Sequence, residues 1–147
     1  MKYKLVAFWL VVFGALFAFL QTRFEYHFYY IEQSQLFLFT EAYIRNKLLL
    51  PGGFSMLVAE FLVQFFIRPY VGALVTAALL TGVGVCTAGI VKRIAPISGL
   101  FILYVLPMLA LLFMHFDFNY RVQGTVCYLM MMALLCGYMR IRNELFR

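Results

Sequence analysis

Both histidines of this 147-residue chain stand two residues from an acid, in the pairs Glu25/His27 and His115/Asp117. In an extended segment, residues i and i+2 point to the same side. Each pair would then present a carboxylate and an imidazole together, which suits proton transfer or the binding of a divalent metal. Pairs with this spacing also arise by coincidence. Polar interfacial residues that hydrogen-bond to neighbouring loops are therefore the alternative interpretation, and it needs no cofactor.

Glu60 stands in an apolar stretch, residues 54–67, which also contains Gln64 and ends just before Arg68. The spacing i, i+4, i+8 places these three polar side chains on one helical stripe, opposite an apolar face. A charge in or near hydrocarbon costs about 2.5–3.5 kcal/mol on insertion scales, so it normally pairs or lines a polar cavity. The stripe predicts either a structural pairing of Glu60 or a relay from Glu60 through Gln64 to Arg68.

Aromatic side chains crowd the segment that precedes this stretch, Tyr29 and Tyr30 among them. They could stack on sugars or lipid headgroups, but tyrosine at headgroup level is also an ordinary membrane anchor, and we favour anchoring. The candidate catalytic residues are Glu25, Glu32 and Glu60. The candidate binding residues are His27, Tyr29, Tyr30, Gln33, Gln64, Arg68, His115, Asp117 and Arg121.

The composition defines the solvent around these residues. The chain is 65% hydrophobic and only 12% charged, with a mean hydropathy of +0.92, whereas soluble domains are roughly 45–50% apolar and about 25% charged. These few charged residues cannot form a shell that faces water, and most of the chain must therefore face lipid. The three cysteines lie in apolar runs without metal-binding spacing and are expected to fill helix contacts.

The hydropathy pattern predicts an all-α membrane protein with four transmembrane helices and one interfacial or re-entrant amphipathic helix. We expect one membrane module with spans at residues 5–22, 70–91, 97–114 and 125–139. An outer loop is expected over residues 23–53, the interfacial helix over 54–67 and a second outer loop over 115–124. Part of the first outer loop, residues 35–47, can also be drawn as a helix, and Pro51-Gly52-Gly53 breaks the chain before the next one.

Small residues recur every four positions in the second span, at Ala73 and Ala77 and again at Gly84 and Ala88. Such lines let helices approach closely in lipid. They predict a contact with a membrane-protein partner or self-association, in addition to contact with the bilayer.

The charges indicate how the chain is threaded. With the N-terminus in the cytoplasm, four crossings return the C-terminus there. Seven bases and one acid then lie inside, while five bases and five acids lie outside. The whole net charge of +6 is therefore cytoplasmic, as the positive-inside rule expects. The basic balance predicts the topology of a bacterial inner-membrane protein with both termini cytoplasmic, and argues against a nucleic-acid partner.

Three motifs carry a resemblance to a known family: residues 26–39 (YHFYYIEQSQLFLF), residues 51–53 (PGG) and residues 60–65 (EFLVQF). They resemble the N-terminal part of an uncharacterised family of long bacterial multi-pass membrane proteins, a family whose function is unknown. Members of that family are considerably longer. The resemblance therefore implies that this chain is a fragment or a truncated relative, and it implies no activity.

The chain is also loosely similar to membrane glycosyltransferases of the C-type fold. Those enzymes place an acid in the first outer loop and follow it with helices that lie along the membrane. The similarity implies such places for Glu25 or Glu32 and for the helix at residues 54–67. The paired-acid motif of those enzymes is absent here, and four crossings are far fewer than they have.

Two hypotheses follow for the function. In the first, the chain is a non-catalytic membrane module whose outer loop docks a partner or the rest of a longer chain. In the second, it is the N-terminal part of an enzyme that acts on a lipid-linked substrate at the outer leaflet, with Glu25, Glu32 or Glu60 as base or metal ligand. A fragment of a transporter is a third alternative.

Overall fold

The computed structural model describes residues 2–94 and 101–145, and every regular element in that part of the chain is helical. In chain order the elements are α1 (Lys2–Arg23), α2 (Glu25–Ser34), α3 (Glu41–Leu48), α4 (Gly53–Val63), the 3-10 helix η1 (Gln64–Ile67), α5 (Val71–Ile94), α6 (Phe101–Met114) and α7 (Val122–Leu145). The expected all-α class is confirmed.

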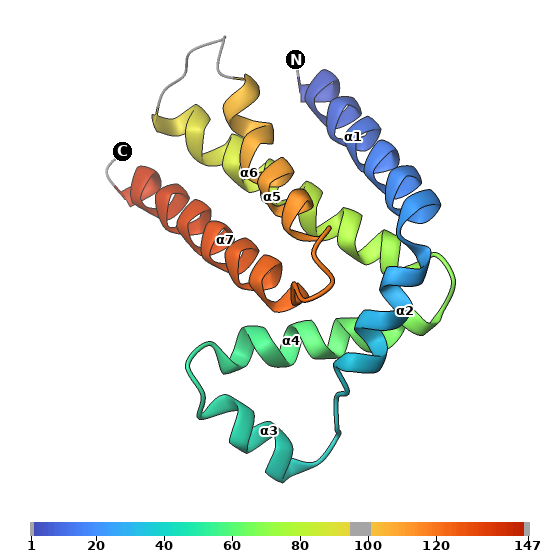
Figure 1. The fold of residues 1–147 in the computed structure, drawn as a ribbon. Coiled ribbons are helices and arrows are strands. Elements are labelled where there is room, and N and C mark those ends of the chain that lie inside the picture. The colour runs from blue at the N-terminus through green and yellow to red at the C-terminus, as the bar shows by residue number, and fades with distance from the viewer. Residues whose placement is uncertain (1, 95–100, 146–147) are drawn as a thin grey trace.

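The central helix is α5, against which α1, α6 and α7 all pack (Figure 1). Leu80 and Val83 of α5 are fully buried at the middle of the bundle. Small residues on α5 allow the close approach of its neighbours. A Cβ atom at Gly84 would lie 2.5 Å from the Trp9 ring of α1, so only glycine fits there without movement.

Helix directions give the bundle two different ends. Helix α1 runs toward one end, and α5 and α7 run away from it (Figure 1). Helix α4 lies across this end, where it contacts α7, and α3 lies on the far side of α4. We call it the hairpin end. The opposite end is the basic end, which carries Lys4, Lys92, Arg93, Arg140 and Arg142.

Within the described residues, three helices are long and apolar enough to cross a membrane, at Tyr3–Arg23, Val71–Ile94 and Val122–Arg142. They correspond to three of the four expected spans. The last is much longer than the expected 125–139, because α7 begins at Val122 and continues past its terminal arginines. The remaining span is not confirmed. Helix α6 has 14 described residues, about 21 Å at 1.5 Å per residue, and residues 97–100 lie outside the described part.

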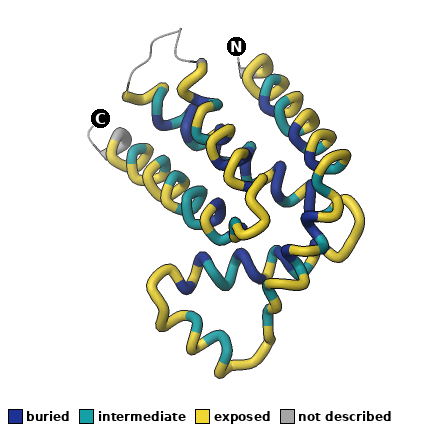
Figure 2. The backbone as a smooth tube through the Cα atoms, in the orientation of Figure 1, coloured by how far each residue is buried: buried dark blue, intermediate teal, exposed yellow. Residues whose placement is uncertain are grey.

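Many residues along α1 and α7 are exposed (Figure 2), and large apolar side chains are among them. Val6 and Leu10 on α1, and Met131 and Leu134 on α7, are all more than half exposed. A soluble protein rarely exposes such continuous apolar faces. Together with the three long apolar helices, they indicate a membrane location.

The segment expected as an outer loop, residues 23–53, contains two helices, α2 and α3. Helix α2 forms where no periodicity was apparent: its face of His27, Phe28 and Ile31 is buried, and the Phe28 ring meets Phe66 of η1 at 5.5 Å between centroids. Helix α3 begins at Glu41 rather than at residue 35. Tertiary packing therefore decides the conformation of α2.

The small residues of α5 do not form a free surface for self-association. Ala73 and Ala77 have no exposed area and Ala88 is 3% exposed, while Gly84 faces Trp9. The prediction of a self-association face on these residues is wrong, since contacts within the chain already cover them.

Candidate functional site

The helices α3 and α4 form a hairpin whose turn is determined by two glycines. Gly52 has a φ of 73°, in the left-handed region that glycine adopts without strain. A Cβ atom on Gly53 would overlap the carbonyl oxygen of Lys47. The Ser55 hydroxyl donates to the carbonyl oxygen of Gly52 at 2.7 Å and closes the first turn of α4. The sequence Pro51-Gly52-Gly53 therefore folds α3 back onto α4.

Glu60 is the centre of a polar cluster between the two helices. Its Oε1 atom forms an ion pair with Lys47 Nζ at 2.6 Å, and the hydroxyl of Tyr43 donates to Oε2. The Glu60 side chain is 11% exposed and that of Lys47 24%. The Lys47 ammonium also lies 3.3 Å from the Met56 sulfur. Both carboxylate oxygens are thus occupied by donors from α3.

The surroundings of Tyr43 in this cluster raise the pKa of its phenol to about 12. Desolvation by burial is the largest cause, and the hydrogen bond to Glu60 and the charge of Glu60 add to it. The protonated phenol is therefore a permanent donor at neutral pH. Tyr43 also stacks edge-on against Phe37, with ring centroids 5.8 Å apart.

A second contact ties the connection between α2 and α3 to α4. Gln64 Nε2 donates to the carbonyl oxygen of Phe37 at 2.9 Å. The Phe37 ring packs edge-on against Phe61 and Phe39, with centroids 5.9 Å and 4.9 Å away. These contacts hold the segment 35–40 along the hairpin although it has no regular structure.

The prediction of a relay from Glu60 through Gln64 to Arg68 along one helical stripe is wrong. The α-helical register ends at Val63 and a 3-10 turn follows, so the i+8 position no longer lies above Glu60. Arg68 has extended backbone before Pro69, with φ −83° and ψ 134°, as the residue before a proline prefers. Glu60 does pair, but its partner is Lys47 on the preceding helix.

The expected pairing of each histidine with the acid two residues away is also wrong. Glu25 and His27 lie on a helix, where residues i and i+2 point to different sides, and His27 is buried while Glu25 is exposed. His115 is 2% exposed and its Nε2 atom lies 2.9 Å from the Thr125 hydroxyl. Asp117 instead accepts a hydrogen bond from the backbone N–H of Asn119 at 2.9 Å.

The structure brings the two histidines near each other instead. The pKa of His115 is lowered to about 4, by burial above all and also by the neighbouring His27. Burial also lowers the pKa of His27, while Asp117 acts in the opposite direction. Within the described residues, neither ring nitrogen of His27 has a hydrogen-bond partner. The Phe118 ring lies edge-on to this imidazole at a centroid distance of 4.8 Å, so His27 is buried against an aromatic ring.

The other predicted residues lie apart from the Glu60 cluster. Glu25, Tyr29 and Arg68 line one small cavity of about 10 Å³, together with residues at the start of α5. That volume holds about one water molecule. Tyr30 is 51% exposed and its ring meets Phe118 edge-on at 6.0 Å. Three further predicted residues lie at the surface: Glu32 is half-buried, and Gln33 and Arg121 are exposed.

No group of three or more histidine, cysteine, aspartate or glutamate side chains among the described residues could hold a metal ion. The partners of Glu60 are an ammonium and a phenol, which both donate to its carboxylate. The residues of the Glu60 cluster that sequence reasoning missed are Tyr43 and Lys47. The glycine turn that pairs α3 with α4 was the signal that could have found them.

One of three comparisons with known proteins gives a match. A family model described as "Family of unknown function (DUF6057)" matches residues 1–147. No curated protein and no solved structure matches the chain.

Proposed function

The chain belongs to the DUF6057 family of unknown function, and we propose that it is a non-catalytic membrane module whose α3–α4 hairpin docks a partner membrane protein or the rest of a longer chain. The observation that carries the proposal is that one side of α3 contacts α4, while the described residues leave its other side exposed. None of the eight residues of α3, all of them described, is buried. The helix is held by polar contacts to α4.

The free side of α3 is an amphipathic stripe. Glu41, Ile44, Arg45, Leu48 and Leu49 recur at i, i+3, i+4, i+7 and i+8 and line one shallow hollow of about 680 Å³. Leu49 is 78% exposed. Apolar anchors at this spacing, flanked by charges of both signs, suit contact with another helix. The Lys47–Glu60 pair lies on the opposite side of α3 and orients the stripe outward.

The Glu60 cluster itself supports a structural role. Lys47 donates to one carboxylate oxygen of Glu60 and Tyr43 donates to the other, so both oxygens are engaged by α3. A carboxylate held in this way fixes the position of α3.

We further propose four crossings, with both termini in the cytoplasm of a bacterial cell and the hairpin outside. Helix α5 ends at the basic end, while α7 begins at the hairpin end. The chain between them therefore has to return through the bilayer from the basic end to the hairpin end, and α6 runs in that direction. The clustering of Lys4, Lys92, Arg93, Arg140 and Arg142 at one end supports a cytoplasmic basic end.

Photocrosslinking in native membranes tests the docking surface. A photoreactive amino acid at Leu49 should give a discrete polypeptide adduct, or an intramolecular one if the chain continues, whereas the same probe at the 89% exposed Tyr26 of α2 should not. Lys47→Gln should reduce the adduct because α3 loses its orientation. Asn46→Ala, a change at an exposed neighbour, should leave it unchanged. Adducts with lipid alone at Leu49 would refute docking and place the stripe in the headgroup layer.

A further inference from the structure

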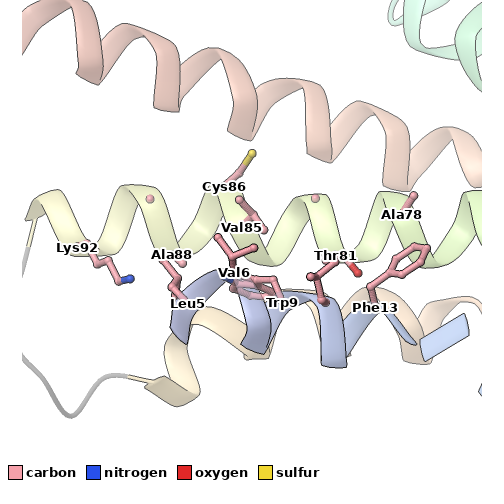
Figure 3. Close-up of a pocket in the computed structure, with 13 residues that line it drawn as sticks. Leu5, Val6, Trp9, Phe13, Ala78, Thr81, Val85, Cys86, Ala88 and Lys92 are labelled. Atoms are coloured by element: carbon pink, nitrogen blue, oxygen red, sulfur yellow. The ribbon is translucent and has the colours of Figure 1, made fainter. Parts of the chain in front are cut away.

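An apolar groove of about 670 Å³ runs between α1 and α5 on the outside of the bundle (Figure 3). Leu5, Trp9 and Phe13 form one wall and Ala78 and Val85 the other. The groove is hollow because small residues lie along α5 where larger side chains would fill it. It faces the side on which a transmembrane bundle meets lipid.

The dimensions of the groove match a lipid chain better than a helix. Its residues on α5 extend from Ala78 to Lys92, which is about 21 Å at 1.5 Å per residue. Half of a bilayer's hydrocarbon core is about 15 Å thick, so the groove covers one leaflet and reaches the headgroups. Volume divided by length gives a mean cross-section of about 30 Å², less than half that of a helix about 10 Å wide.

A fixed positive charge stands at the end of the groove. Lys92 lines it near Leu5 (Figure 3), and its Nζ atom lies 5.7 Å from the centre of the Tyr104 ring. No carboxylate among the described residues forms an ion pair with Lys92. The adjacent Arg93 is used differently, because its Nη1 atom donates to the carbonyl oxygen of Cys136 on α7 at 2.6 Å.

We propose that this groove is a binding site for an anionic phospholipid, with one acyl chain between α1 and α5 and the phosphate on Lys92. Helix α5 has 24 residues, about 36 Å in length, so its last turn extends beyond a hydrocarbon core of about 30 Å. The Lys92 ammonium therefore lies at the level of lipid phosphates. A basic side chain there attracts anionic headgroups, and the Tyr104 ring keeps the ammonium at the edge of the groove.

Fluorescence quenching of Trp9 tests the proposal, because this residue lines the groove and is the only tryptophan of the chain. The protein is reconstituted in phosphatidylcholine bilayers that contain a fixed minor fraction of either brominated phosphatidylglycerol or brominated phosphatidylcholine. We expect the anionic lipid to occupy the groove about fivefold more strongly, the preference that one lysine near the surface gives. Lys92→Gln should abolish that preference.

Two variants make the result specific. Arg93→Gln removes a charge at the same depth but on the side facing α7, and it should retain the preference. Val85→Phe, at a position 46% exposed, fills the groove and should reduce quenching by both lipids. The proposal is wrong if both lipids quench wild-type Trp9 equally, or if Lys92→Gln behaves like Arg93→Gln. Absence of quenching by either lipid would show that a helix or a second copy occupies the groove, and would also overturn it.

Discussion

Removing the Lys47 ammonium should loosen α3 more than neutralising its partner Glu60. In Lys47→Met the side-chain stem remains, but the carboxylate of Glu60, 11% exposed, keeps only the Tyr43 hydroxyl as donor. In Glu60→Gln the amide oxygen still accepts hydrogen bonds, and the Lys47 ammonium, 24% exposed, can turn to water. The two changes break the same ion pair, but they leave different charges unpaired.

The magnitudes follow from the burial of each group. Removing one partner of a fully buried pair costs about 3–5 kcal/mol, and the partial exposure of this pair reduces that to about 2–3 kcal/mol for Lys47→Met. Glu60→Gln loses the charge, but its amide oxygen still accepts from one of the two donors, for a cost of about 1 kcal/mol. The double variant leaves no buried charge. It should therefore cost about 1–2 kcal/mol less than the sum of the single changes.

Hydrogen exchange of the α3 backbone, measured by mass spectrometry on protein in lipid nanodiscs, reads these local free energies directly. Each 1.4 kcal/mol changes the exchange rate about tenfold. We expect α3 to exchange about 30- to 150-fold faster in Lys47→Met and about fivefold faster in Glu60→Gln. The amides of α5 should not change, and neither should α3 in Asn46→Ala. Exchange that is faster in Glu60→Gln than in Lys47→Met would refute the reasoning.

Three other changes test separate parts of the structure. Gly53→Ala should destabilise the hairpin by about 2 kcal/mol or more, because the added methyl group has no space. Hydrogen exchange of α3 measures this loss. Gly137→Ala is the matched control, since nothing lies within 4 Å of a Cβ atom there. Glu60→Gln should lower the pKa of Tyr43 from about 12 part of the way toward 10 in an ultraviolet titration, since desolvation remains; an unchanged pKa would mean that Glu60 does not act on the phenol. The folded protein holds the pKa of His115 at about 4, below its ordinary value of 6.5, so protonation favours unfolding. The free energy of unfolding in detergent should therefore fall by up to about 3 kcal/mol as the pH drops from 6.5 toward 4. The His115→Gln variant should lose most of that slope, and an equal slope in both proteins would contradict the assignment.

The long apolar helices were predictable because their cause is local. In lipid every backbone N–H and C=O must be satisfied within the segment, so a long apolar run has to be helical. Helices α1 and α5 accordingly begin and end within about three residues of the expected positions. Helix α7 extends further at both ends, because Val122 and Gln123 join its first turn and Arg142 lies in its last turn, where positive charge suits the helix dipole.

The conformation around the histidines was not predictable from local pattern. The segment 25–34 is rich in aromatic residues and lacks a clear helical period, yet it forms α2 because Phe28 and Ile31 find a buried surface against η1 and α5. Once α2 is helical, His27 turns away from Glu25 and toward His115. A pair that looked like an acid–base couple in sequence is therefore two separate environments, one exposed and charged, the other apolar and neutral.

The partner of Glu60 was decided by backbone constraints on either side of α4. A helix that continued unbroken would have placed Arg68 two turns away on the same stripe. Pro69 prevents this, because it disfavours helical backbone at Arg68, and the chain leaves the α-helical register at Gln64. On the other side, the left-handed Gly52 folds α3 back until Lys47 reaches the carboxylate. Both constraints are visible in the sequence, so a buried acid between a glycine turn and a proline should be paired across the turn before it is paired along its own helix.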